Sequence, residues 1–406
     1  MINIVIFSGG RGSSTIVPAL LQHQDIRITS IVNAYDDGKS TGEIRNYFEM
    51  LGPSDLRKVQ QLMLPTDDED YHSKYQVFDM RFPIDISDDE ILSQMKQESL
   101  STDFVFFANI FANKDVPNRL RFFLRIFIEN LELIKKTSPD KSLTLKDCSL
   151  MNCLYAGAYI HHKRNIESAT LHLEKLFNLK GSVLPTSIEN KKLVGLREDG
   201  TVLFSESEIV ELRSNTQIKR VYLLDSYPAK NYFKDCSLDE KEKFLENHHC
   251  YVEASPRVVR SIQDADVIVF SAGTQHSSLY PTYLSRGIAQ SISDNKNAVK
   301  LFITNIGADY ETPTYKAHDY IEGAYKYLNL CDPRQYNYED LFDIMLVNDS
   351  NDATNSNYVA INSEKLDNIP VRKVIDKFEY KKTGKHDGEK IADFIISLYQ
   401  STLNAD

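Results

Sequence analysis

The sequence predicts an α/β protein built on a mostly parallel sheet with helices on both faces. Continuous apolar runs of strand length are typical of strands buried on both faces, and they occur near both ends of the chain: INIVIF, RITSIVNAY, DADVIVFSAG and AVKLFITNIG. Between them lie a long segment with apolar residues at helical spacing and a shorter one with strand alternation. The expected fold is therefore Rossmann-like, with a helical insertion and a small β-rich inset.

Changes of pattern divide the chain into four stretches. Residues 1–65 alternate strand and helix and form the first half of a Rossmann-like nucleotide-binding core. Residues 66–180 form a mainly helical insertion or cap, with FVFFANIFANKD, NRLRFFLRIFIENLELIKK and LKDCSLMNCLYAGAYIHHKR as helical segments. Residues 181–260 form the β-rich inset and the return to the core. Residues 261–406 supply the second half of the core and a C-terminal helix.

Local signals place further elements within these stretches. An EDG turn between alternating runs predicts a hairpin tip in the inset. In the last stretch, DIMLVND predicts an added strand, NDSNDATNSN a polar loop and KHDGEKIADFIISLYQ an amphipathic closing helix.

Composition and charge exclude several classes of partner. The chain has 42% hydrophobic residues and no apolar run near the roughly 18 residues of a membrane span, so we expect no membrane association. Its 47 basic against 58 acidic residues give a net charge of −11, which disfavours nucleic-acid binding. An odd number of cysteines without a C-x-x-C pair suits a reducing compartment, and the chain starts directly with a strand pattern, so we expect a cytoplasmic protein. The 22 tyrosines and 20 phenylalanines leave apolar surface for a homo-oligomer.

The first apolar run leads into a glycine-rich turn, IVIFSGGRGSST. A helix cap at Thr15 places Pro18 harmlessly in the first helical turn, so Gly9 to Ser14 belong to the turn. Glycines let the backbone approach a phosphate, and serines beside a helix N-terminus supply hydrogen-bond donors. The candidate phosphate-binding residues are Gly9, Gly10, Gly12, Ser13 and Ser14. A tight strand-to-helix turn made for packing alone is the competing interpretation.

Two common nucleotide motifs are excluded. A dinucleotide fingerprint that starts at Gly10 requires glycine or alanine at position 15, where Thr15 stands. The G-K-[ST] of a P-loop is absent as well. The sequence therefore predicts neither NAD nor Walker-type ATP binding.

The loop after the second strand is acidic. Asp36 and Asp37 fall where the strand ends, and Ser40 with Glu43 predicts a capping box that begins a helix. Asp55 lies at another expected helix start. Carboxylates there could hold Mg²⁺ against a diphosphate, whereas favourable contact of acidic groups with helix N-termini is the structural alternative.

Two arginines accompany these aspartates. Arg45 and Arg57 could grip phosphate as bidentate donors or pair with a neighbouring acid.

The loop after the third apolar run, SAGTQHSSLYPTYL, is rich in hydroxyl groups. Thr274, Ser277 and Ser278 follow Gly273 and could donate to ligand oxygens, while an N-cap cluster is the structural alternative. His276 is a weaker candidate for acid–base work because no partner can be named. His161 and His162 are adjacent on a predicted helix and cannot face one metal, so no structural zinc is expected.

Taken together, these blocks resemble the family of 2-phospho-L-lactate transferases (CofD-like proteins) and their bacterial YvcK-type relatives. The resemblance rests on GGRGSS, NAYDDGKSTGEIR, GPSDLRK, SLMNCLYAGAY, the strand-rich segment from residue 181, SAGTQHSSLYPTYLSRGIAQSI and HDGEKIADFI, in that order through most of the chain.

The resemblance implies a Rossmann-like sheet that holds a nucleoside diphosphate derivative of the GDP type. In the transferase branch an acceptor hydroxyl attacks the distal phosphorus and nucleoside monophosphate leaves, with help from a divalent metal. The matching blocks put Mg²⁺ on Asp37 and Asp55 and the substrate near Asn152, and Arg45 adds charge neutralisation to these catalytic groups. Positioning and charge neutralisation are what phosphoryl transfer needs.

The leading expectation is an enzyme, a metal-dependent transferase, but departures from the family pattern leave an alternative open. Lys39 replaces a small residue in the D-D-G-x-S turn and Met151 replaces a glycine. The G-x-S-x-G-x-x-R motif is closer to that of the YvcK-type branch. This resemblance implies a non-catalytic UDP-sugar-binding regulator of carbon metabolism and cell-wall synthesis.

Overall fold

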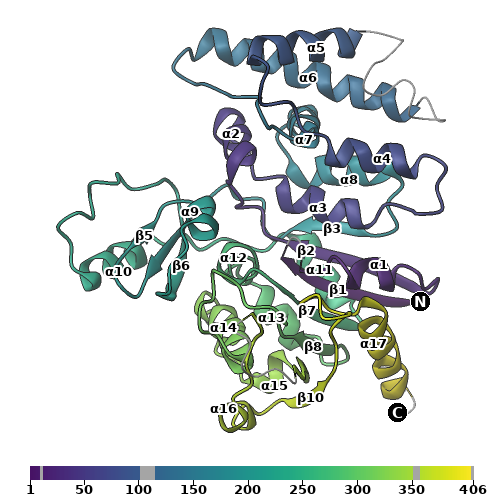
Figure 1. Cartoon of the computed structure of the whole chain (residues 1–406), viewed down its shortest axis with the longest axis vertical. Helices are drawn as coiled ribbons and strands as arrows, with labels where there is room; N and C mark the ends of the chain where they lie inside the picture. The colour runs from purple at the N-terminus through teal and green to yellow at the C-terminus, as the bar shows by residue number, and fades with distance from the viewer. Residues whose placement is uncertain (10–11, 101–114, 351–356, 404–406) are drawn as a thin grey trace. The chain divides into compact units, whose positions relative to one another are not determined.

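The computed structural model describes residues 1–9, 12–100, 115–350 and 357–403, and in this part of the chain a seven-stranded sheet dominates (Figure 1). Its strand order is β10-β9-β8-β7-β1-β2-β3, and the pairs from β10 to β2 are parallel. The strands are β1 (Ile2–Gly9), β2 (Ile26–Val32), β3 (Ser182–Pro185), β7 (Val267–Gly273), β8 (Val299–Ile303), β9 (Ile344–Asn348) and β10 (Arg372–Asp376). The predicted assembly of the sheet from both ends of the chain is confirmed, and DIMLVND is a strand.

The chain forms two compact units. One contains Met1–Tyr35 and Leu184–Asp406 and carries most of the large sheet; the other contains Asp36–Val183. The boundary at residue 65 drawn from the sequence falls inside the second unit. None of the described helices combines the length and the apolarity that a membrane span requires.

Helices of the first unit pack in two groups. The short α1 contacts the closing helix α17, whereas α11, α14 and α15 each contact α13. Ser255 caps α11 with its side chain and Pro256 stands at the first helical position, as expected at a helix start. The bounds are α1 (Ile16–Leu20), α11 (Pro256–Gln263), α13 (Ile288–Asp294), α14 (Ala317–Leu330), α15 (Tyr338–Leu341), α16 (Ser363–Asp367) and α17 (Gly388–Leu403).

The β-rich inset is a small antiparallel sheet. Its order is β5-β4-β6, formed by β4 (Lys192–Arg197), β5 (Val202–Leu203) and β6 (Ile218–Leu224), with α9 (Glu206–Glu211) and α10 (Leu238–Asn247) beside it. The predicted EDG hairpin tip is confirmed, since Gly200 adopts φ +83°, a left-handed conformation that favours glycine. A separate apolar core supports this sheet: Val194, Leu196, Tyr222, Leu224, Phe233 and Leu245 are all buried.

The second unit is helical, as the apolar spacing predicted. Its helices are α2 (Lys39–Phe48), α3 (Ser54–Leu62), α4 (Tyr71–Asp79), α5 (Asp88–Leu100), α6 (Asp115–Thr137), α7 (Leu150–His161) and α8 (Ile166–Phe177). The long α6 packs against α5 and α7. The predicted helical segment FVFFANIFANKD lies outside the described residues except for Asp115, the first residue of α6, and so does most of the polar loop NDSNDATNSN in the other unit.

One predicted helix start is wrong. The capping box of Ser40 and Glu43 does not form, because Gly38 is the N-cap of α2 and Ser40 is the second residue inside the helix. Ser40 is buried and its hydroxyl accepts a hydrogen bond from the Asn152 amide, so it is not free to cap.

Candidate functional site

The strand order of the large sheet reverses direction between β1 and β7. From β1 the chain moves to β2 on one side, and from β7 it moves to β8 on the other. Gly9 and Gly273, the last residues of these two strands, are register partners. In open parallel sheets ligands bind beyond the carboxyl ends of the strands at such a switch point. The glycine turn and the hydroxyl-rich loop therefore open at the same place.

The glycine turn is shaped by close packing. A Cβ on Gly12 would lie 1.8 Å from the carbonyl oxygen of Ala272, and its N–H donates to the carbonyl of Gly9 at 3.0 Å. Gly12 thus serves packing and a tight turn, which was the competing interpretation of this motif. Gly10 lies outside the described residues.

A polar group in this turn remains for a ligand. Ser13 is fully buried and its Oγ makes no hydrogen bond within the described residues, although buried hydroxyls normally have partners. Ser14 is half-buried, and α1 begins at Ile16 after Thr15, as the position of Pro18 predicted. Because α1 has only five residues, its dipole adds little, and Ser13 is the stronger anion-binding candidate.

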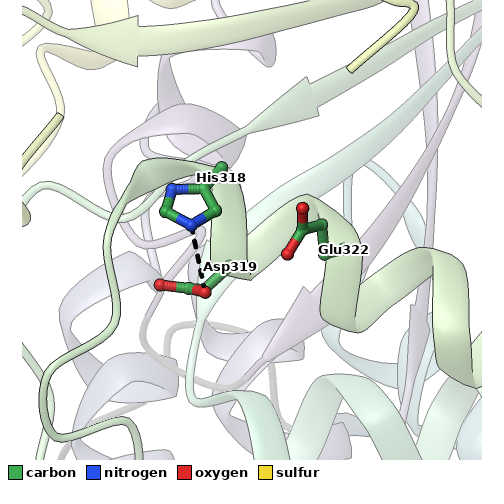
Figure 2. A group of neighbouring side chains, drawn as sticks. All are labelled: His318, Asp319 and Glu322. Atoms are coloured by element: carbon green, nitrogen blue, oxygen red, sulfur yellow. Dashed lines mark ion pairs between the residues drawn. The ribbon is translucent and has the colours of Figure 1, made fainter. Parts of the chain in front are cut away.

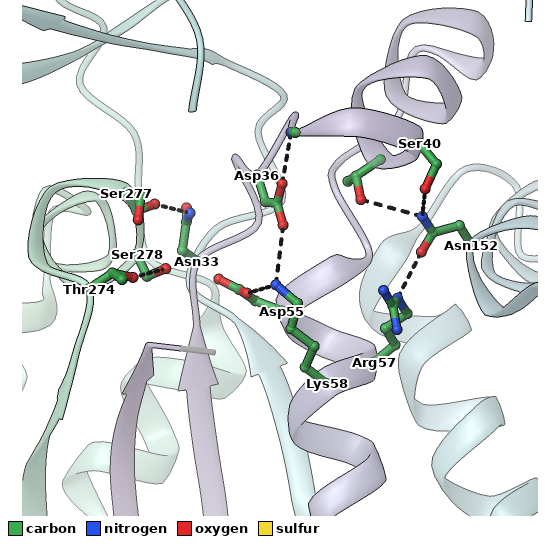
Figure 3. A network of polar contacts seen from close by, with 12 residues as sticks. Asn33, Asp36, Ser40, Asp55, Arg57, Lys58, Asn152, Thr274, Ser277 and Ser278 are labelled. Atoms are coloured by element: carbon green, nitrogen blue, oxygen red, sulfur yellow. Dashed lines mark hydrogen bonds and ion pairs between the residues drawn. The ribbon is translucent and has the colours of Figure 1, made fainter. Parts of the chain in front are cut away.

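The loop after β7 forms a π-helical turn, η1 (Gln275–Leu279), which runs into α12 (Tyr280–Tyr283). Such turns are frequent at functional sites. Thr274 is the N-cap of η1, and its hydroxyl donates to Ser278 Oγ at 3.0 Å (Figure 3). The two hydroxyls expected to contact a ligand therefore contact each other.

Amide side chains from neighbouring strands fix this loop. Asn305, after β8, accepts from the Gly273 N–H at 2.9 Å and donates to the Gly273 carbonyl at 3.0 Å. Asn33, after β2, donates to the carbonyl of Ser277 at 2.8 Å (Figure 3). The ends of β2, β7 and β8 are thereby joined by hydrogen bonds, so the site has a preformed backbone.

A buried carboxylate that the sequence did not reveal supports η1. Glu311 is 1% exposed; its Oε2 accepts the N–H groups of His276 and Ser277 at 3.0 Å each, and its Oε1 accepts the Ser277 hydroxyl at 2.5 Å. Burial, with the nearby charge of Asp309, raises the pKa of Glu311 to about 7. No spacing rule singles out Glu311, because it lies 35 and 34 residues from His276 and Ser277, whose groups it binds.

His276 does not suit acid–base work in this arrangement. The ring is 1% exposed, and burial lowers the pKa of His276 to about 3. The imidazole is therefore neutral at physiological pH, and Nδ1 makes no hydrogen bond within the described residues.

In the second unit, the half-buried Lys58 side chain lies between two of the predicted acidic groups. The Lys58 ammonium is 3.2 Å from Asp55 Oδ1 and 3.8 Å from Asp36 Oδ2 (Figure 3). Both carboxylates are buried, and Asp55 stands in the first turn of α3 as the sequence predicted. Burial favours the neutral amine, yet the charges of Asp55 and Asp36 together raise the pKa of Lys58 above its ordinary value. The aspartate that shares this cation with Asp55 is Asp36; Asp37 is half-buried beside it.

The two arginines of this unit hold its own structure together. Arg45 is fully buried, and its guanidinium donates to the carbonyls of Met50 and Asp36 at 3.3 Å each. Arg57 donates to Asn152 Oδ1 at 3.1 Å (Figure 3), and burial lowers the pKa of its guanidinium. Both arginines thus hold chain groups that would otherwise be buried without partners.

Asn152, predicted to lie near substrate, is at the centre of this network. Its Nδ2 donates to the hydroxyls of Ser40 and Thr41 at 3.3 Å each, and its Oδ1 accepts from Arg57. The side chain therefore ties α7 to the first turn of α2 and to α3.

The comparisons with known proteins agree with this architecture. The family model described as "2-phospho-L-lactate transferase CofD" matches residues 4–379. The chain belongs to the CofD family. Curated relatives named "Gluconeogenesis factor", from Listeria monocytogenes and Halalkalibacterium halodurans, are each 23% identical, with 99% and 97% of this chain and 97% and 95% of the relatives covered.

Solved structures show the same fold. Two crystal structures of one Bacillus halodurans protein, described as a member of the UPF0052 family, align with a TM-score of 0.65 and 22% identity. They cover 97% of this chain and 99% and 98% of theirs. The predicted Rossmann-like α/β architecture is thereby confirmed.

Proposed function

We propose that this protein binds a nucleoside diphosphate derivative at the carboxyl ends of β1 and β7 and acts as a regulator of carbon metabolism, of the kind that the name of its gluconeogenesis-factor relatives describes. The observation that carries the proposal is the switch point itself, where Gly9 and Gly273 end neighbouring strands. A Cβ on Gly273 would lie 3.1 Å from the backbone of Gly9, so the two glycines let the loops after β1 and β7 come together, and the Ser13 hydroxyl, which has no partner within the described residues, supplies a donor.

The acidic groups of the second unit support binding without metal chemistry. A resident Mg²⁺ requires carboxylate oxygens that are not already neutralised, whereas Lys58 supplies a positive charge to both Asp36 and Asp55. A Mg²⁺ ion on Asp55 would therefore have to displace the Lys58 ammonium from Oδ1. Arg45 and Arg57, the groups expected to stabilise a transferring phosphoryl group, are engaged by the chain's own oxygens.

The family match favours a second candidate function. A member of the transferase branch would pass the phospho-group of a GDP-linked compound to an acceptor hydroxyl and release nucleoside monophosphate, with Asp37, Asp55 and Arg45 in the reaction and Mg²⁺ on the two aspartates. The model match over residues 4–379 supports this candidate, because it covers nearly the whole chain.

A thermal-shift screen separates the two functions. The panel is GDP, GMP, UDP, UDP-sugars, ADP and NAD, each with and without Mg²⁺. At a hundred times its dissociation constant the cognate ligand should add about 2.7 kcal/mol to the free energy of unfolding. Stabilisation by a nucleoside diphosphate derivative that is indifferent to Mg²⁺ supports the regulator; stabilisation by guanine nucleotides that grows with Mg²⁺ supports the transferase. No response to any nucleotide contradicts both.

Three substitutions sharpen the screen. Ser13→Ala should weaken binding of the responding nucleotide about tenfold, the worth of a typical hydrogen bond, while Ser401→Ala on the exposed end of α17 should leave it unchanged. Under the transferase alternative, Asp55→Ala should abolish release of nucleoside monophosphate and retain most of the nucleotide affinity. Equal nucleotide affinity in the wild type and Ser13→Ala would refute the proposed place of the phosphates.

A further inference from the structure

A cluster of possible metal ligands lies at the start of α14, apart from the acidic groups of the second unit. His318, Asp319 and Glu322 each offer one ligand atom, and these atoms all lie within 4.8 Å of one another (Figure 2). Within the described parts of the chain this is the one group of three His, Cys, Asp or Glu side chains that meets this distance. His318 and Glu322 stand four residues apart, so they share a face of the helix. Asp319 is adjacent to His318, the spacing that argued against a shared metal at His161 and His162, but here its Oδ1 lies 3.3 Å from His318 Nε2.

The histidine of this cluster is buried without a hydrogen bond. His318 is 1% exposed, and neither Nδ1 nor Nε2 has a hydrogen-bond partner within the described residues. Its Nε2 lies 3.3 Å from Asp319 Oδ1, the direction in which the other ligand atoms lie (Figure 2). Leaving a buried polar group unsatisfied is unfavourable, and a bound ion is one of the accepted explanations for such a group.

The two carboxylates differ in how they are held. Asp319 Oδ2 accepts the Lys316 N–H at 2.7 Å, which fixes the carboxylate and leaves Oδ1 facing the imidazole. Glu322 is exposed, so it can move toward an ion and leaves one side of the site open to water. Two negative charges also offset the positive end of the helix, which by itself disfavours a cation.

We propose that His318, Asp319 and Glu322 bind a divalent transition-metal ion of the Zn²⁺ class. One imidazole nitrogen with two carboxylate oxygens suits such an ion, with water completing the shell, whereas Mg²⁺ prefers oxygen ligands alone. Each ligand atom would lie about 2.0–2.2 Å from a bound zinc ion. This site is independent of the proposed nucleotide site.

The test is a Zn²⁺ titration of the full chain in competition with a chromophoric chelator. We expect one equivalent of tight binding in the wild type and at least tenfold weaker binding in Glu322→Gln, with Mg²⁺ unable to compete. Glu322 is exposed, so this variant should fold, which far-ultraviolet circular dichroism checks. His318→Ala should also lose binding. Glu339→Gln, an exposed glutamate on α15, is the matched control and should bind as the wild type does.

A competing histidine pair gives the decisive contrast. His162 Nε2 and His172 Nδ1 lie 2.9 Å apart in the helical unit, so they could also take up zinc. If His172→Gln removes the bound equivalent while Glu322→Gln retains it, the proposed site is wrong. It is equally wrong if the wild type takes up no zinc, or if Mg²⁺ competes with zinc at comparable concentration.

Discussion

Ser277 donates its hydroxyl proton to Glu311 across 2.5 Å, and both groups are almost completely buried. The same carboxylate accepts two backbone N–H groups at the start of η1. The loop after β8 therefore holds the loop after β7, and the walls of the candidate nucleotide site depend on one buried carboxyl group.

The first prediction concerns pH. The pKa of Glu311 is raised to about 7, above the ordinary value of 4.5, so the folded protein binds this proton more tightly than the unfolded chain. Its contribution to the free energy of unfolding is then fully present below pH 4.5 and is lost as pH rises through 7. Glu311→Gln should remove this dependence. Urea unfolding of both proteins between pH 4.5 and 7.5 should give a difference that changes by about 1–3 kcal/mol.

The sign of the change in this free-energy difference with pH tests the prediction. The wild type should lose stability relative to Glu311→Gln as pH rises. A difference that is constant over this range would show that the carboxyl group has an ordinary pKa.

The second prediction concerns Asn305 as a positioning residue. Its amide bonds both the N–H and the carbonyl of Gly273, so Asn305→Ala should loosen the end of β7 and weaken nucleotide binding about tenfold. Isothermal titration with the nucleotide found in the screen measures the effect. Asn368→Ala, at an exposed helix end, should bind as the wild type does. Unchanged affinity in Asn305→Ala would show that the loop is held without it.

The third prediction concerns the glycine turn. Gly12→Ala would force a Cβ to 1.8 Å from the Ala272 carbonyl, so backbone must shift. We expect a loss of about 1–3 kcal/mol in the free energy of unfolding, typical of overpacking, measured by chemical denaturation. Gly307→Ala is the matched control, because within the described part of the chain its Cβ would meet no atom nearer than 3.6 Å, so the variant should change stability little. Equal stability of the two variants would mean that the turn relaxes freely.

The fourth prediction concerns Lys39, the residue that departs from the small residue of the family turn. Lys39 is exposed and has φ +46°, a left-handed conformation that is unfavourable for a lysine. Lys39→Gly should therefore raise the free energy of unfolding by about 0.5–1 kcal/mol. Lys146→Gly, at an exposed position without a positive φ, should lower it slightly. Destabilisation by Lys39→Gly would show that the lysine side chain makes a favourable contact.

Local chemistry in the sequence determined the main elements. Strands buried on both faces need continuous apolar runs, so β1, β2, β7 and β8 could be predicted from the local sequence alone. Pro18 fixed the start of α1, and the turn at Gly200 required a residue that tolerates positive φ. These signals depend only on neighbouring residues, so the elements that they predict are present in the folded chain.

The tertiary structure decided which polar groups are engaged. Gly38 displaced Ser40 as a helix cap, and Lys58 came to lie between Asp36 and Asp55. Asn152 met Arg57 across 95 residues of sequence, and Glu311 met Ser277 across 34. A polar side chain can form hydrogen bonds with many partners. Burial selects among them, because leaving a buried polar group unpaired costs free energy. The sequence by itself thus determined the sheet and the places where its loops open, whereas long-range packing decided which side chains there are neutralised and which remain for a ligand.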